Sequence, residues 1–268
     1  MAGRGQNPDF VEALARGLDV LTCFDDTRRE LSLAEVAAAT DLARPTARRL
    51  LVTLQELGYV RLLANGSFAL TPQVLRLGTA YASSLGLWEM ARPHLEALVA
   101  RTHESSSISQ LDGPDIVYVA RVSVPKIIAL RVDIGTRFPA VPTSQGKVLL
   151  AQLDDAELDE VLAAPSRSGI VTRPAERAAL ADELALVRAR GWALADEELA
   201  PGIRSAAVPL RDGQGVVRAA MNVTTHAAET SVETLVESHL PLLIAAAGRV
   251  SSDWAVWQAR PTAEVVGS

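Results

Sequence analysis

Three arginines within a short segment are the clearest sign of binding chemistry in this sequence. Arg44, Arg48 and Arg49 surround Thr46, and apolar residues recur around them every three or four positions. The arginines would therefore share one face of a helix. An arginine can bond guanine O6 and N7 together, at roughly 1–3 kcal/mol of discrimination per good contact, or neutralise a phosphate. The pattern predicts a nucleic-acid-binding helix, although a merely solvated arginine-rich face fits the same residues.

A second group of polar residues lies much later in the chain and could bind an acid. Ser144 and Gln145 come just before an expected helix, and the amides at a helix N-terminus attract a carboxylate. Arg204 could hold a carboxylate through two parallel hydrogen bonds. It could equally form a surface ion pair with Glu197 or Glu198. These residues predict a site for a small acid.

No group of residues predicts catalysis or metal binding. The segment Gly146-Lys147 lacks the other residues of a phosphate-binding loop, and Ser144 does not stand in a G-x-S-x-G elbow. Spacing typical of metal ligands is absent from the four histidines, His94, His103, His226 and His239. We therefore expect no enzyme activity, no cofactor and no metal site.

The pattern of residues 32 to 57 predicts a helix-turn-helix, which would hold the arginines in place. Ser32 and Glu35 have the spacing of a capping box, which marks the start of its first helix. The second helix carries leucines at helical spacing and tolerates Pro45 in its first turn. Gly58 stands where a helix commonly ends, because glycine readily adopts a positive φ.

Residues 58 to 70 are expected to form a hairpin, or wing, beside this motif. An Asn-Gly turn signal separates two short apolar runs. From Ala43 to Arg76 there are five arginines and one acidic residue, a local net charge of +4 in a chain of net charge −6. A basic region in an acidic protein is typical of a DNA-facing surface. The residues expected at that surface are Ser32, Arg44, Pro45, Thr46, Arg48, Arg49, Asn65, Gly66 and Ser67.

Composition sets broad limits on the rest of the protein. A chain of 268 residues with 49% hydrophobic and 22% charged residues is expected to fold into one or two globular domains. Cys23 is the only cysteine, so it cannot form an intramolecular disulfide, and its apolar neighbours predict a packing role. No apolar run approaches the twenty residues of a membrane span, and the N-terminus does not resemble a signal peptide. We expect a cytoplasmic protein without membrane contact.

The hydrophobic periodicity divides the chain into regions. A first helix is expected at 10–24, another from Thr71-Pro72 to Trp88, and a further one opening at Pro93. From about residue 105 the period becomes 2, with a turn at 112–115. Further helices are expected at 146–151, 156–163, 174–190 and 232–250, and strands at 127–132, 206–210 and 216–224. Strand pairs around a helical middle predict an α+β fold with an antiparallel sheet.

Several segments together resemble the IclR family of bacterial transcription regulators. The first is TDLARPTARRLLVTLQELGYV, followed by the wing and LTPQVLRLG. The others are GTRFPA with TSQGKVLLA, and DEELAPGIRSAAVPL. The resemblance implies a flexible tail (1–9), a winged helix-turn-helix domain (10–71), a linker helix (72–89), a GAF-like effector-binding domain (90–255) and a C-terminal tail (256–268). A plain core helix is the alternative for 72–89.

The resemblance also implies a ligand and partners. ARVSVPKI, TSQGKVLLA and GIRSAAVPL are most similar to the branch that governs aromatic-acid catabolism, the protocatechuate and 4-hydroxybenzoate regulators of the β-ketoadipate pathway. The implied effector is an aromatic acid or β-ketoadipate, the alternative a short keto acid such as pyruvate or glyoxylate. The implied pocket residues are Leu130, Phe138, Ser144, Gln145, Ile203, Ser205, Asn222 and Thr224. Arg204 is expected beside them, because its guanidinium can bind a carboxylate.

The expected function is therefore sequence-specific regulation of transcription under the control of a small carboxylate. The expected partners are double-stranded operator DNA, a second copy of the chain or a dimer of dimers, and RNA polymerase. Activation and repression fit the sequence equally well. Two rival classes also remain: an enzyme with an accessory DNA-binding domain, and a DNA-binding protein whose second domain only mediates oligomerisation.

Overall fold

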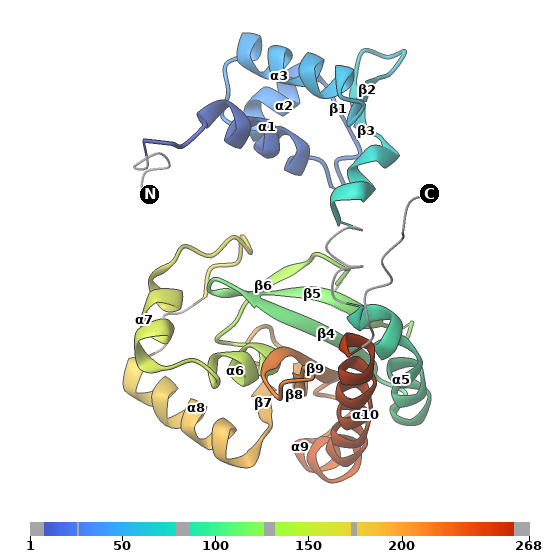
Figure 1. Ribbon diagram of the computed structural model, residues 1–268, viewed down its shortest axis with the longest axis vertical. Coiled ribbons are helices and arrows are strands. Elements are labelled where there is room, and N and C mark those ends of the chain that lie inside the picture. Colours follow the sequence, from blue (N-terminus) through green and yellow to red (C-terminus); the bar gives the residue numbers. More distant parts are fainter. Residues whose placement is uncertain (1–7, 26, 79–85, 126–131, 173–175, 260–268) are drawn as a thin grey trace. The chain divides into compact units, whose positions relative to one another are not determined.

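The computed structural model describes residues 8–25, 27–78, 86–125, 132–172 and 176–259 (Figure 1). The chain divides into two compact units, Met1–Ser84 and Leu85–Ser268. The strand expected at 127–132, with Leu130 in it, lies almost entirely outside the described residues.

The N-terminal unit is a winged helix-turn-helix (Figure 1). Its elements are α1 (Glu12–Thr22), β1 (Glu30–Leu31), α2 (Leu33–Ala39), α3 (Arg44–Glu56), β2 (Val60–Leu62) and β3 (Phe68–Leu70). Ser32 caps α2, and the capping box with Glu35 is complete, as the spacing predicts. The three strands pair antiparallel in the order β1-β3-β2. Strand β1 was not expected, because two residues carry too little pattern to predict a strand.

The core of this unit joins the three helices to the wing. Val20 of α1, Val36 of α2 and Leu51 of α3 are fully buried in it. Cys23 is buried in the same cluster, which confirms its packing role.

The helix expected from residue 72 to 89 differs from the structure at its C-terminal end. Residues 72–74 form the short 3₁₀ helix η1 (Pro72–Val74), and residues 75–78 are α-helical as expected. Residues 79–85 of the expected helix lie outside the described residues, and a new helix, α5 (Leu87–Thr102), begins behind Gly86. Gly86 has a φ of 58° and lies against the ring of Trp257, where a Cβ atom would come within 2.4 Å of ring carbon. Residues 87–89 therefore belong to α5. Pro93 lies inside this helix and does not open it, contrary to our expectation.

The C-terminal unit is built on a six-stranded antiparallel sheet of order β6-β5-β4-β9-β8-β7 (Figure 1). Its strands are β4 (Ser105–Asp112), β5 (Asp115–Val122), β6 (Arg137–Pro139), β7 (Ala193–Asp196), β8 (Ile203–Arg211) and β9 (Val217–His226). The turn at residues 112–115 joins β4 to β5 as predicted. The α+β fold with an antiparallel sheet is confirmed.

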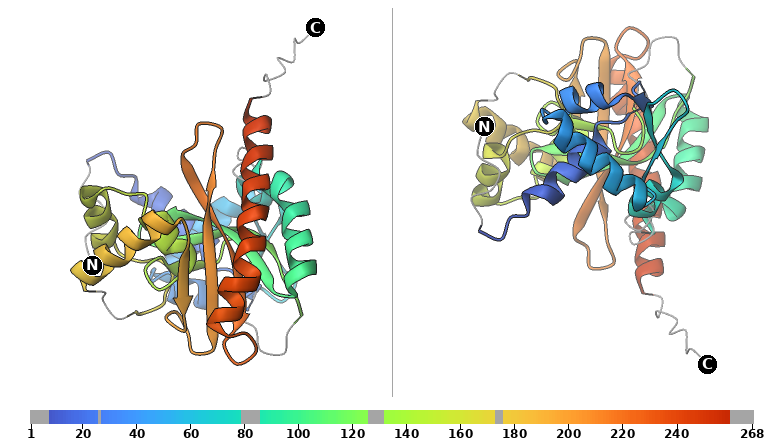
Figure 2. Two further views of the ribbon diagram at one scale, coloured as in Figure 1. Left: turned by 90° about the horizontal axis from the view of Figure 1, so that it is seen from below. Right: turned by 90° about the horizontal axis from the view of Figure 1, so that it is seen from above.

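Helices cover both faces of this sheet. α5 and α10 (Leu240–Gln258) lie side by side on one face, where Ile108 and Met221 are fully buried (Figure 2). On the other face α6 (Ser144–Leu150) lies against the sheet. α7 (Asp155–Ala163) and α8 (Arg177–Arg190) contribute to the same core, and α8 contacts α6. Side chains alternate along β4. Its even-numbered residues therefore point toward α5 and α10, and its odd-numbered residues point toward α6.

The last helical segment is less regular than its sequence pattern predicted. It consists of α9 (Val232–Thr234), a π-helical turn η2 (Leu235–His239) and α10. Pro241 stands in the first turn of α10 and has no amide hydrogen to donate, which accounts for a change of helical type just before it. α10 also continues to Gln258, beyond the helix end expected at residue 250 and the domain boundary expected at residue 255.

Candidate DNA-binding surface and effector cavity

The N-terminal half of α3 presents the arginine cluster to solvent. Arg44, Pro45, Arg48 and Arg49 are exposed, and Thr46 is half-buried. The opposite face of α3 is buried through Ala47, Leu51 and Leu54, so packing fixes the direction in which the arginines point. The structure thus brings these predicted residues together on one accessible helix face, the arrangement of a recognition helix.

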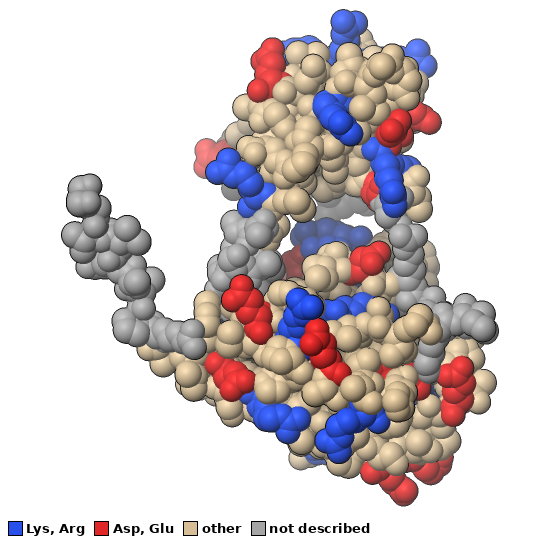
Figure 3. All heavy atoms as spheres, turned by 90° about the vertical axis from the view of Figure 1, so that its right-hand side faces the viewer, with Lys and Arg blue, Asp and Glu red and all other residues tan. Residues whose placement is uncertain are grey.

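The wing turn is ordered by its own hydrogen bonds. Asn65 Oδ1 accepts a hydrogen bond of 2.9 Å from the Ser67 amide, and Gly66 has a φ of 82°. The Asn65 side-chain amide also donates to Glu30 Oε2 at 3.3 Å. Ser32 is different, because its hydroxyl accepts the Glu35 amide of the capping box. Figure 3 shows exposed basic side chains on this unit, several of them gathered at one end.

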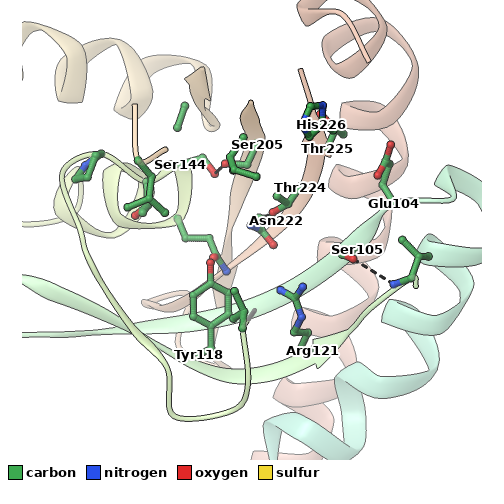
Figure 4. A pocket seen from close by; sticks show the side chains of 18 residues that line it. Glu104, Ser105, Tyr118, Arg121, Ser144, Ser205, Asn222, Thr224, Thr225 and His226 are labelled. Carbon is green, nitrogen blue, oxygen red and sulfur yellow. Dashed lines mark hydrogen bonds between the residues drawn. The ribbon is translucent and has the colours of Figure 1, made fainter. Parts of the chain in front are cut away.

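A cavity opens between the sheet and α6 in the C-terminal unit (Figure 4). The cavity volume is about 60 Å³. Six of the predicted pocket residues line it: Ser144, Gln145, Ile203, Ser205, Asn222 and Thr224. The sequence did not point to the others, which are Glu104, Ser105, Tyr118, Arg121, Val124, Val132, Pro142, Thr143, Ala195, Leu199, Thr225 and His226.

A β-bulge explains how Tyr118 and Arg121 both come to line the cavity. Residues three apart on a regular strand point to opposite faces. In β5, however, Ala120 pairs with Ile108 while Tyr118 pairs with Ser109, so Val119 is an extra residue. A bulge re-aims the side chains that follow it. The alternation of a regular strand would have placed Arg121 on the face opposite to Tyr118, so the sequence alone could not predict that Arg121 lines the cavity.

Arg121 brings a positive charge into the cavity. Its Nη1 donates to Ser107 Oγ at 3.3 Å, and in the described part of the chain it forms no ion pair. Burial lowers the pKa of the guanidinium, with the nearby Tyr118 and Asp133 acting in the opposite direction. In Figure 4 the guanidinium points toward the side chains of Asn222 and Thr224. A partly desolvated cation of this kind favours an anionic ligand.

Tyr118 forms a wall beside Arg121 and remains a neutral phenol. Its side chain is buried, and its ring meets that of Phe138 edge to face at 5.7 Å between centroids. Burial raises the pKa of Tyr118 to about 12, with the charge of Arg121 partly offsetting the effect. Its hydroxyl is therefore available as a hydrogen-bond donor at neutral pH.

The wall formed by β8, β9 and α6 carries a chain of small polar groups. Ser144 Oγ and Ser205 Oγ lie 2.7 Å apart. Asn222 accepts the Ser107 amide through Oδ1 at 3.0 Å and donates to Thr224 Oγ1 at 2.9 Å. These neutral groups can bond a ligand without adding charge. The sequence predicts Ser144 before the helix, whereas in the structure it is the first residue of α6, which Thr143 caps.

Two of the predicted pocket residues, Phe138 and Arg204, do not line the cavity. Leu130 lies outside the described residues. Phe138 is buried behind Tyr118. Arg204 is buried too, and its guanidinium donates to Asp196 Oδ1 at 2.6 Å and to the Thr230 carbonyl at 2.7 Å. Arg204 is therefore neither in the cavity nor paired with Glu197 or Glu198, and the guanidinium that lines the cavity belongs to Arg121.

A buried lysine fixes the helix and the loop that border the cavity. Lys147 of α6 is 1% exposed, and its ammonium donates to Glu183 of α8 at 2.6 Å and to Glu198 at 2.6 and 2.7 Å. Glu198 belongs to the loop between β7 and β8, which also carries Leu199 on the cavity wall. This ion-pair cluster ties the loop to α6.

Other kinds of site have little support in the described residues. No three His, Cys, Asp or Glu side chains there are grouped so that they could hold a metal ion. Nor is any described helix both long and apolar enough to cross a membrane.

Comparison with known proteins identifies the family. The sequence profile of the IclR helix-turn-helix domain matches residues 13–63, and that of the C-terminal domain of bacterial IclR transcriptional regulators matches residues 79–252. The chain belongs to the IclR family of transcriptional regulators. The resemblance noted in the sequence is thereby confirmed, and the second profile spans the cavity.

Individual relatives extend over nearly the whole chain. The Pca regulon regulatory protein of Pseudomonas putida is 39% identical, over 90% of this chain and 83% of its own length. The p-hydroxybenzoate hydroxylase transcriptional activator of Acinetobacter baylyi is 34% identical, over 88% and 89% respectively. A solved structure of a proposed transcriptional regulator from Rhodococcus sp. RHA1 is 48% identical, with a TM-score of 0.78 over 92% of this chain and all of its own.

Proposed function

We propose that this IclR-family regulator senses a small aromatic carboxylate in the cavity of its C-terminal unit and thereby controls genes of aromatic-acid catabolism. The observation that carries the proposal is Arg121, a partly buried guanidinium with a neutral hydroxyl partner and no ion pair in the described part of the chain. A carboxylate would supply the missing charge and bond it bidentately.

The cavity walls favour an aromatic acid over a short keto acid. Apolar side chains of Val124, Pro142, Leu199 and Ile203 line it together with the ring of Tyr118. Pockets for small molecules typically combine apolar walls with a few placed polar groups. Pyruvate or glyoxylate would use the polar groups but cover little of this apolar surface. The Acinetobacter relative is named as a transcriptional activator for p-hydroxybenzoate hydroxylase, which supports a link to aromatic-acid metabolism.

Operator binding in the presence of candidate acids tests the proposal. DNA from upstream of the protein's own gene would be titrated with protein alone and with protocatechuate, 4-hydroxybenzoate, β-ketoadipate, pyruvate or glyoxylate. We expect an aromatic acid to change the operator affinity. A response to the short keto acids only would overturn the assignment to aromatic acids while leaving the regulator in place.

The variant Arg121→Gln tests the carboxylate contact directly. Loss of a charged hydrogen-bonding partner costs about 1.5–3 kcal/mol, so the Kd for the acid should rise about tenfold to a hundredfold. Arg92→Gln is the matched control, because Arg92 is an exposed arginine of the same unit, on α5. Calorimetric titration of both variants gives the comparison, and equal affinities would remove Arg121 from the site.

We further propose that α3 and the wing contact operator DNA. Arg44, Arg48 and Arg49 are exposed on one face, as a helix entering the major groove requires. Asn65, Gly66 and Ser67 would lie against the sugar-phosphate backbone. The hydroxyl of Ser32 is already engaged in the capping box, so its contribution would be to position α2.

The regulator is proposed to act as a homodimer, with a dimer of dimers as the larger form. An apolar groove of the N-terminal unit supports this, since it is bordered by Leu14 and Leu18 of α1, Leu57 and Leu77, all about half or more exposed. A contiguous exposed apolar surface typically marks an interaction site. Two-fold symmetry predicts operator half-sites about one helical turn apart.

The remaining parts of the proposal follow from the family. The relatives are transcriptional regulators, and we propose that this chain acts in the cytoplasm as one of them, without enzyme activity. Contact with RNA polymerase would serve either activation or repression. A ligand shifts an equilibrium only through its different affinity for two states, so the cavity alone does not fix the direction of regulation.

A further inference from the structure

One exposed apolar side chain of α3 is explained neither by the core of the N-terminal unit nor by its apolar groove. Val52 is 44% exposed, whereas Leu51 and Leu54 of the same helix are buried. In the described structure Val52 does not belong to the hydrophobic cluster that joins the helices to the wing. It also lies outside the groove, whose lining on α3 includes Arg49 and Leu57. Packing within the unit and the proposed dimer interface therefore do not account for this side chain.

Valine is also an unfavourable residue for an exposed position in a helix. Its branched Cβ restricts the side chain against the preceding turn, so alanine or a long polar residue would stabilise α3 more. An exposed apolar side chain gains nothing from water in return. Val52 is thus better suited to contact with another molecule than to the stability of the helix that carries it.

The position of Val52 places it between exposed arginines. With 3.6 residues per turn, it is about 40° around the helix from Arg48 and about 60° from Arg49 on the other side. Four exposed residues share the spacing i, i+3, i+4, i+7, which places them along one helix face: Pro45, Arg48, Arg49 and Val52. Recognition helices that lie along the major groove read bases with residues at this spacing. Val52 is therefore within the face that would enter the groove.

The major groove offers one apolar group to such a side chain. Of the four bases only thymine carries a methyl group, at C5, and aliphatic side chains contact it there. The neighbouring guanidinium groups suit guanine or phosphate instead. We infer that Val52 contacts the 5-methyl group of a thymine in each operator half-site and thereby discriminates against bases that lack it. The inference rests on the proposed function and deepens it, since it specifies a base that α3 reads.

Replacement of thymine by 2′-deoxyuridine tests the contact, because it removes the methyl group and keeps the base pair. DNA from upstream of the protein's own gene would first be footprinted with the full-length protein. Duplexes would then be made with uracil at one thymine of the footprint at a time. At one thymine of a half-site we expect uracil to raise the Kd about threefold to tenfold, as the loss of one buried methyl group should.

The variant Val52→Ala shows whether Val52 makes this contact. It should bind the thymine duplex about threefold to tenfold more weakly than the wild type and bind the uracil duplex equally well. Alanine favours a helix more than valine does, so the variant should fold. Val216→Ala is the matched control, because Val216 is 42% exposed but lies in the other unit. The control should keep the full preference for thymine.

The outcomes separate this inference from the proposed function. If the wild type binds every uracil duplex as tightly as the thymine duplex, Val52 reads no methyl group, although the protein remains an operator-binding regulator. A preference for thymine that persists in Val52→Ala would also overturn the inference, because DNA shape or another residue would then be its cause. If the full-length protein binds no upstream DNA, the proposed DNA contacts of α3 fail, and the role of Val52 with them.

Discussion

At the residue scale, the buried phenol of Tyr118 should make the stability of the folded protein depend on pH in the alkaline range. Its pKa is about 12 in the folded protein, against an ordinary 10. Between these values the unfolded chain loses the proton that the folded chain keeps. The unfolded state then binds fewer protons, so the free energy of unfolding falls as pH rises, by up to about 1.4 kcal/mol per unit. Below pH 10 the effect is absent.

Urea unfolding of the wild type and Tyr118→Phe at pH 9 and pH 11 measures this contribution. The wild type should lose about 1 kcal/mol more than the variant between the two pH values. Tyr59→Phe, which removes a phenol from the other unit, should behave as the wild type. An identical pH dependence in all three proteins would contradict the prediction. Fluorescence reports the relevant unit, since it contains all four tryptophans, Trp88, Trp192, Trp254 and Trp257.

Arg204 and Arg121, the two candidates for binding the acid, show that residue type alone does not tell which arginine lines the cavity. Arg204 has the right chemistry and lies next to Ile203 and Ser205 in the sequence. On a strand, however, neighbours point to opposite faces, and Arg204 turns away to Asp196. Arg121 faces the cavity only because a bulge changes the alternation at Val119. The sequence could therefore predict the small polar residues that line the cavity but not the arginine beside them.

At the scale of elements, close approach of α6 to the chain around Ala140 requires Gly146. A Cβ atom at this position would lie 1.9 Å from the Ala140 carbonyl oxygen. Gly146→Ala should therefore destabilise the C-terminal unit by about 1–3 kcal/mol or more, as overpacking of a core does. It should also weaken acid binding, because Ser144 and Gln145 are carried by the same helix.

A second glycine supplies the control for this experiment. Gly248 lies inside α10, with nothing within 4 Å of an added Cβ. Gly248→Ala should be stabilising by about 0.5–1 kcal/mol, because alanine loses less conformational freedom in a helix. Urea unfolding followed by tryptophan fluorescence measures both variants. Opposite signs are expected, and a neutral Gly146→Ala would mean that α6 can shift freely.

The elements with strong local signals could be predicted, and those defined by tertiary contacts could not. The capping box at Ser32 and the turn at residues 112–115 each satisfy backbone groups locally, and the structure has both. The short strands β1 and β6 exist only through their pairing partners, β3 and β5. The start of α5 depends on the contact of Gly86 with Trp257, which is 171 positions later in the numbering.

At the scale of the whole molecule, a regulator must couple its acid site to its DNA site, and this coupling is open to measurement. If the acid changes operator affinity by some factor, linkage requires that operator DNA change acid affinity by the same factor. We expect a factor of about 5 to 150, the usual range for coupled sites. A protein whose C-terminal unit only mediates oligomerisation would give a factor of one in both directions.

The measurement is a thermodynamic cycle on the full-length chain. The acid is titrated into protein alone and into protein saturated with operator, and the operator is titrated with and without saturating acid. Arg121→Gln should lower acid affinity on both arms while leaving operator affinity without acid unchanged, because Arg121 lies in the C-terminal unit and the proposed DNA contacts in the other. A change in acid-free operator affinity would instead show that Arg121 sets the equilibrium between the two regulatory states even in the empty protein.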